Sequence, residues 1–109
     1  MIKTISKISI TFALLFSLAS AVAEDEHKVL QQDKAFSTES LTIKVGDSVK
    51  FENADDFFHN VYSLSSLKSF DLGSYPAGEA RSVKFEEAGE VEVECAIHPS
   101  MYMTIKVEE

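Results

Sequence analysis

The sequence has a single cysteine, Cys95, among its 109 residues. No disulfide can therefore form within the chain. An unpaired cysteine in a protein that enters an oxidising compartment indicates a reactive thiol, a bond to another chain or a metal ligand. The environment of Cys95 decides between these alternatives.

Basic residues are scarce. The chain has 10 lysine and arginine residues against 18 aspartate and glutamate residues, a formal net charge of −8. Removing Lys3 and Lys7 with the first 23 residues brings the charge of the remainder to about −10. This acidity argues against binding to nucleic acids or anionic lipid surfaces. It is compatible with a basic partner protein and equally with plain solubility.

Long hydrophobic runs are also lacking. Residues 8–18 form an apolar run that is too short to span a bilayer, which takes about 20 residues in a helix. The run follows Lys3 and Lys7 and precedes Ala21-Val22-Ala23, the layout of a secretory signal peptide. We predict that residues 1–23 are a cleaved signal peptide and that residues 24–109 form one soluble periplasmic domain. No cysteine lies near the cut, so no lipid anchor is expected.

Helical periodicity is missing after residue 24. Alternation of apolar and polar residues recurs instead, which predicts β-strands. Gly46-Asp47 separates two of the runs and predicts a hairpin, whereas residues 65–79 are predicted to be irregular. About seven strands with one apolar face each predict an all-β antiparallel sandwich. The predicted strands cover residues 29–36, 41–45, 49–52, 59–63, 83–85, 91–95 and 101–107.

A thiol, an imidazole and a thioether lie within seven residues, at Cys95, His98 and Met101. Cys95 continues the core-facing alternation of its strand, so its sulfur is expected to point inward. Pro99 ends that strand and restricts His98 to extended geometry. Met101 then begins the returning strand with its side chain inward. His59, at the start of another strand, is expected to reach the same end of the sandwich.

Two histidines, a cysteine and a methionine are typical of a mononuclear blue-copper site, with a trigonal plane of nitrogen and sulfur and a long axial thioether. Two choices stay open on residue pattern alone. Met103 shares its face with Met101 and competes for the axial position. His27 competes with His59, although its charged surroundings indicate a solvated side chain.

Four stretches within residues 41–107 stand out: His59-Asn60-Val61, Phe70-Asp71-Leu72-Gly73, Val91-x-Val93-x-Cys95 and Cys95-x-x-His98-Pro99-x-Met101. They resemble the cupredoxins, specifically the amicyanin and plastocyanin group, which includes exported methylamine-utilisation proteins. The resemblance implies a Greek-key sandwich with one type 1 copper ion bound by His59, Cys95, His98 and Met101. It favours Met101 over Met103, because the tail after Met101 has the family's length.

The resemblance also assigns residues around the ligands. Asn60 and Pro99 would support the ligand loop. Phe57, Phe58 and Tyr102 would form an apolar rim around the edge of His98, where a redox partner docks. The chain departs from the common pattern at Ala96, where relatives carry serine or threonine, and at Ile97, where they carry proline. Asn60 is therefore expected to need another partner.

The function implied is that of a monomeric electron carrier, not an enzyme, between partners such as a c-type cytochrome and an amine dehydrogenase. Copper delivery or sensing with the same ligands is the alternative. A histidine-brace copper enzyme would need a histidine at the mature N-terminus. Cleavage after Ala23 leaves Glu24 there, so that alternative requires a cut before His27.

Overall fold

The structure is a computed structural model that describes residues 24–109. The predicted signal peptide, residues 1–23, lies outside these described residues. No helix within residues 24–109 is long and apolar enough to cross a membrane. The described part contains nine strands: β1 (Glu26–Gln32), β2 (Ala35–Phe36), β3 (Ser40–Lys44), β4 (Ser48–Asn53), β5 (His59–Ser63), β6 (Phe70–Tyr75), β7 (Ala80–Lys84), β8 (Gly89–Glu94) and β9 (Tyr102–Glu108).

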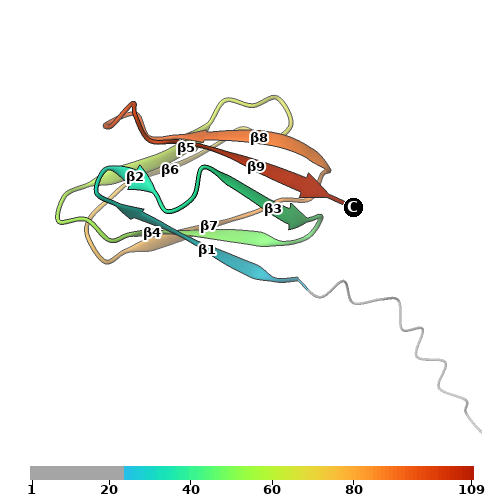
Figure 1. The fold of residues 1–109 in the computed structure, drawn as a ribbon, viewed down its shortest axis with the longest axis horizontal. Coiled ribbons are helices and arrows are strands. Elements are labelled where there is room, and N and C mark those ends of the chain that lie inside the picture. The colour runs from blue at the N-terminus through green and yellow to red at the C-terminus, as the bar shows by residue number, and fades with distance from the viewer. Residues whose placement is uncertain (1–23) are drawn as a thin grey trace, which may run out of the picture.

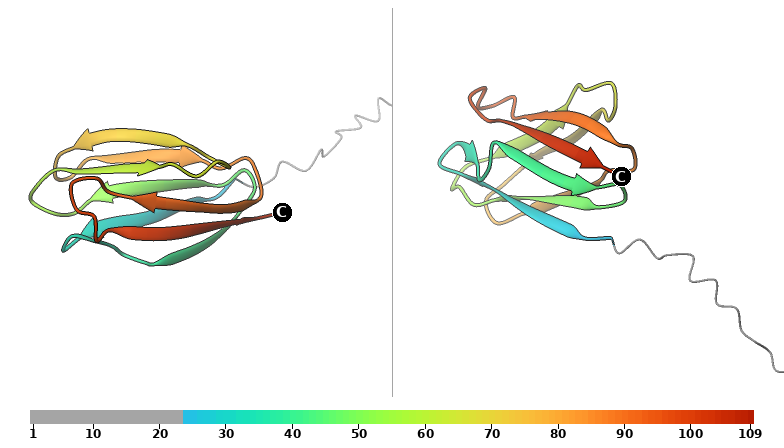
Figure 2. Two further views of the ribbon diagram at one scale, coloured as in Figure 1. Left: turned by 90° about the horizontal axis from the view of Figure 1, so that it is seen from above. Right: turned by 45° about the vertical axis from the view of Figure 1, so that its right-hand side comes forward.

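Two sheets pack face to face (Figures 1 and 2). One has the strand order β2-β1-β4-β7 and the other β3-β9-β8-β5-β6. In β4, β5, β8 and β9 alternate residues turn inward, so the core is built from the inner faces of both sheets. The predicted all-β sandwich of two sheets is confirmed. Core residues with no exposed surface include Val29, Val49 and Phe51 from one sheet and Val91, Val93 and Ile105 from the other.

The predicted hairpin at Gly46-Asp47 is wrong, because β3 and β4 lie in different sheets. β3 pairs with β9 and β4 pairs with β1, both in parallel register, while β4 also pairs with β7 in antiparallel register. The sandwich is therefore not purely antiparallel. Alternation shows which face of a strand is buried but not which strand lies beside it. Two runs that each bury one face satisfy that pattern equally well from opposite layers.

Two further segments differ from expectation. The segment 65–79, predicted to be irregular, contains β6, which pairs with β5 through an irregular register between Asn60 and Tyr62. The first predicted strand, 29–36, is split into β1 and β2 by a tight turn. Asp33 and Lys34 in this turn have φ angles of 55° and 56°. The left-handed conformation ends a strand, and a short apolar pattern does not reveal it.

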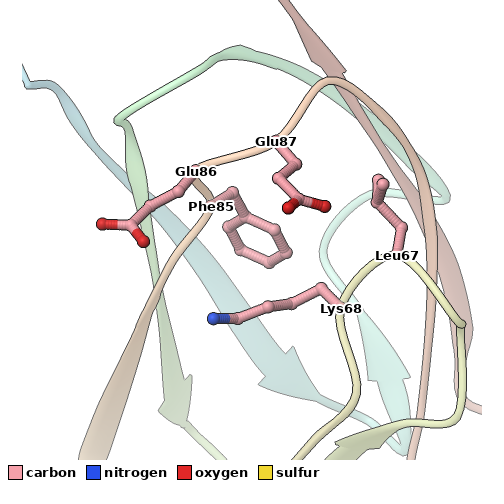
Figure 3. Close-up of a pocket in the computed structure, with 5 residues that line it drawn as sticks. All are labelled: Leu67, Lys68, Phe85, Glu86 and Glu87. Atoms are coloured by element: carbon pink, nitrogen blue, oxygen red, sulfur yellow. The ribbon is translucent and has the colours of Figure 1, made fainter.

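The ends of three strands define one end of the sandwich. β8 ends at Glu94, β9 begins at Tyr102 and β5 begins at His59, so the loop 95–101 lies beside the start of β5, far from the C-terminus (Figure 1). The opposite end carries a hollow of about 180 Å³ between two loops (Figure 3). Its lining has no histidine or cysteine and consists of Leu67, Lys68, Phe85, Glu86 and Glu87.

Candidate metal site

His59 and Cys95 are brought together by neighbouring strands of one sheet. His59 opens β5 and Cys95 directly follows β8; their exposed fractions are 0% and 1%. The Sγ atom of Cys95 lies 3.8 Å from Nδ1 of His59. The prediction that both side chains point into the core at one end of the sandwich is confirmed.

The loop 95–101 is closed by its own backbone. The amide of Cys95 donates to the carbonyl of Met101 at 3.3 Å, and the amide of Met101 donates to the carbonyl of His98 at 2.9 Å. This tight closure folds the half-buried His98 over His59, with 4.8 Å between the ring centroids. The two Nδ1 atoms are 3.1 Å apart.

Three potential ligand atoms, one each from His59, Cys95 and His98, lie within 4.8 Å of one another. A single soft metal ion could accept all three donors, and thiolate together with imidazole suits copper as well as zinc. The residues present therefore fit a copper ion.

Asp55 is a site residue that the sequence reasoning missed. Its Oδ2 lies 2.6 Å from Nε2 of His59. When Nε2–H donates to this carboxylate, the Nδ1 of the neutral ring keeps its lone pair towards Cys95 and His98. In the sequence, the one sign of this role is that Asp55 lies four residues before His59 in a predicted loop. The spacing alone does not show that the carboxylate reaches the imidazole.

Asp55 is itself held by the turn between β1 and β2. Its two oxygens accept the amides of Asp33 at 2.7 Å and Lys34 at 3.1 Å. Burial alone would raise the pKa of Asp55, but the hydrogen bonds from His59 and from these two amides outweigh it and the pKa is lowered. Asp55 is therefore ionised at neutral pH, as a carboxylate that orients a metal-binding histidine should be.

His98 is kept in its neutral, metal-binding form. Burial is the main cause that lowers its pKa, and the charges of His59 and Lys34 add to the effect, while the carboxylate of Asp55 opposes it. A neutral imidazole has a free lone pair, so this environment favours metal binding over protonation.

The fold distinguishes His59 from His27, the other histidine considered as a ligand. His27 lies away from the loop 95–101, with Nε2 2.9 Å from Oδ2 of Asp47 in the turn between β3 and β4.

Met101 and Met103 are both fully buried, as their register predicted. Met101 closes the loop, whereas Met103 sits within β9 opposite Val93. Met101 therefore lies nearer than Met103 to the end of the sandwich that carries His98.

Asn60 ties β5 to the same loop. Its Oδ1 accepts the backbone amide of Ala96 at 2.8 Å. Asn60 has another partner, as expected. It bonds to the main-chain amide of Ala96 in place of the side-chain hydroxyl group that relatives carry at this position. The loop therefore keeps its anchor without a hydroxyl group at Ala96.

Several large apolar side chains adjoin the ligand residues in the sequence, and one of them, Phe57, contacts both histidines. Phe57, Phe58, Ile97 and Tyr102 are large apolar side chains that remain exposed, between 39% and 55% of their surface. The ring of Phe57 lies 5.1 Å from that of His59 and 5.2 Å from that of His98, centroid to centroid. Of the residues of the predicted rim, Phe57 is thus the one that lies against the histidine pair.

Known proteins place this architecture in a family. The model of copper-binding proteins of the plastocyanin/azurin family matches residues 23–108. The methylamine utilization protein MauL of Methylorubrum extorquens is 33% identical over 101 residues, covering 92% of this chain and 88% of that protein.

Solved structures agree. A reduced variant of amicyanin superimposes with a TM-score of 0.72 and 28% identity, over 81% of this chain and 87% of that one. A copper-containing nitrite reductase from Thermus scotoductus gives a TM-score of 0.72 and 27% identity, over 77% of this chain but only 22% of the longer enzyme. With its sandwich and its cluster of histidine and cysteine ligands, the chain belongs to the plastocyanin/azurin family of copper-binding proteins.

Proposed function

We propose that His59, Cys95, His98 and Met101 bind one copper ion and that the protein carries single electrons between redox proteins in the periplasm. The observation that carries this proposal is the convergence of three potential ligand atoms within 4.8 Å at one end of the sandwich. Membership of the copper-binding family and the likeness to amicyanin support it.

Each residue has a distinct part. Copper bound here would supply reversible one-electron chemistry between Cu(II) and Cu(I). Cys95 offers a thiolate and an electronic path into β8. Asp55 holds the ring of His59 in one orientation, so little rearrangement accompanies a change of charge. Met101 would add a thioether sulfur, a weak ligand that favours neither oxidation state strongly.

Electrons are proposed to enter and leave through His98, the half-buried histidine of the cluster. The surrounding rim of Phe57, Phe58 and Tyr102 offers a desolvated contact for a partner. A c-type cytochrome is the expected partner, and an amine dehydrogenase is a second, supported by the name of the MauL relative.

We propose a carrier and not an enzyme, because four protein ligands would leave no open position for a substrate. The domain is expected to act as a monomer after removal of residues 1–23, and its excess of acidic residues argues against nucleic acid as a partner.

The test is to add Cu(II) to the purified domain, residues 24–109, and to follow absorption in the visible range. A saturating, intense thiolate-to-copper band at one copper per chain is expected, lost in Cys95→Ser. The band should vanish with a mild reductant and return with an oxidant over repeated cycles. Absence of the band in freshly reduced protein would contradict copper binding by Cys95. Rapid loss of Cu(I) to a chelator during the cycles would indicate copper delivery instead of electron transfer.

A further inference from the structure

Lys34 places a positive charge at the rim of the proposed copper site. Its ammonium nitrogen lies 5.7 Å from the ring centroid of Phe57, the same ring that contacts both His59 and His98. The side chain is exposed, and none of the ion pairs formed within residues 24–109 includes it. The charge is therefore available to a molecule that docks on the rim.

The position of Lys34 is fixed by its backbone. Lys34 and Asp33 both adopt the left-handed conformation, and both donate their amides to the buried carboxylate of Asp55. Asp55 in turn holds His59. The base of the Lys34 side chain is thus joined to a proposed copper ligand through two hydrogen bonds, and cation–π attraction to Phe57 keeps its end near the rim.

The charge at Lys34 has the opposite sign to that of the molecule. Acidic side chains outnumber basic ones by about ten in residues 24–109. A basic partner would be attracted by the whole domain but would meet Lys34 at the point of contact. A partner with a carboxylate at its contact face would be favoured there.

On the basis of the proposed function, we infer that Lys34 is a specificity-determining residue, which recognises a carboxylate beside the redox centre of the partner when that partner docks on Phe57 and Phe58. Charges at the rim of an interface act mainly on the rate of association and on its salt dependence. The effect should therefore appear in bimolecular electron-transfer rates at low ionic strength and weaken when salt shortens the range of the charges.

Small redox reagents of opposite charge test this without an identified partner. The copper-loaded, reduced domain is mixed with hexacyanoferrate(III), an anion, or with tris(phenanthroline)cobalt(III), a cation. Each takes one electron from Cu(I), giving Cu(II) and hexacyanoferrate(II) or the cobalt(II) complex. Lys34→Gln is compared with Lys44→Gln, which removes the same charge from the far end of β3, beside Glu108 of β9.

Lys34→Gln is expected to slow the anionic reagent relative to the cationic one by roughly 3- to 10-fold at low ionic strength, from the attraction between a trivalent anion and one charge at close range. Lys44→Gln should leave that ratio near the unmodified value, Lys34→Arg should restore it, and high salt should remove the difference. Equal ratios in Lys34→Gln and Lys44→Gln would overturn the inference while the proposed function stands. Failure of the unmodified domain to form the thiolate band or to react with either reagent would overturn both.

Discussion

Asp55 matters at the scale of single residues because it fixes the tautomer and orientation of His59 through a 2.6 Å contact. Removing such a partner of a metal-binding histidine typically costs about 10- to 100-fold in metal affinity. We expect Asp55→Ala to weaken copper binding by about that factor, measured by competition with a Cu(I) chelator. Asp56→Ala, at the exposed neighbouring carboxylate, is the control and should bind as the unmodified domain does. Equal affinity in the two variants would show that Asp55 does not support the site.

Met101 and Met103 provide a matched pair. Replacement of either by leucine conserves volume and should cost less than about 1.5 kcal/mol of folding stability. Met101→Leu is expected to shift the visible spectrum and the reduction potential, because the axial ligand tunes both. Met103→Leu should leave them unchanged. The reverse result would assign the axial position to Met103.

Residue-level reasoning predicted His59, Cys95 and His98 correctly as a cluster because strand alternation fixes which side chains turn inward. It could not find Asp55, whose contact with His59 depends on the path of an irregular loop. It also could not find Lys34, because the left-handed turn that presents this side chain was hidden inside a predicted strand.

At the scale of elements, the turn between β3 and β4 is held by Asp47. Its side chain accepts the amides of Lys44 at 3.0 Å and Asp25 at 3.1 Å, and it lies 2.9 Å from Nε2 of His27. The hydrogen bond from His27 is the main cause that lowers the pKa of Asp47 to about 2, followed by the amide of Lys44 and opposed by burial.

A carboxyl group whose pKa is lowered by folding stabilises the protein above its unfolded pKa and loses that contribution as the pH falls through the folded pKa. We expect the unfolding temperature of the metal-free domain to fall between pH 3.8 and about pH 2. Asp47→Asn should flatten this part of the profile, whereas Glu90→Gln, an exposed control on β8, should not. An unchanged slope in Asp47→Asn would show that another group is responsible.

Gly89, at the start of β8, has a backbone conformation that favours glycine and lies against Leu67 of the loop before β6. Its φ is +141°, and a Cβ atom there would lie 2.7 Å from Cδ2 of Leu67. Gly78 also has a positive φ, of +83°, but faces open space. The contact is with the far end of a flexible side chain, so the backbone conformation should cost more than the contact: a φ of +141° is accessible essentially to glycine alone, whereas +83° lies near the left-handed region that other residues adopt. Gly89→Ala should therefore lower the free energy of unfolding by about 1–3 kcal/mol more than Gly78→Ala. Denaturant unfolding measures the difference, and equal losses would contradict the predicted strain at Gly89.

Element positions were largely predictable from alternation, but their partners were not. Val49 and Phe51 turn inward from β4 as expected, yet β4 pairs with β1 and β7 instead of β3. Partner choice depends on the closing of the whole sandwich, which brings β1 beside β4 and β3 beside β9. Local periodicity contains no information on either contact.

At the scale of the whole molecule, the sandwich brings the loop between β8 and β9 and the first residue of β5 to the same end. Residues 95–101 join β8 to β9, and His59 comes from 36 positions earlier than Cys95. The ligand cluster depends on this long-range pairing, so a cooperative fold is required before copper can be bound with the proposed geometry.

Copper binding by Cys95, His59 and His98 can be tested by X-ray absorption of the copper-loaded domain, because this measurement reports the atoms bound to the metal. One thiolate sulfur and two imidazole nitrogens are expected at short distance, with the sulfur lost in Cys95→Ser and one nitrogen lost in His59→Ala. A first coordination sphere of nitrogen and oxygen alone, unchanged in Cys95→Ser, would contradict this set of ligands.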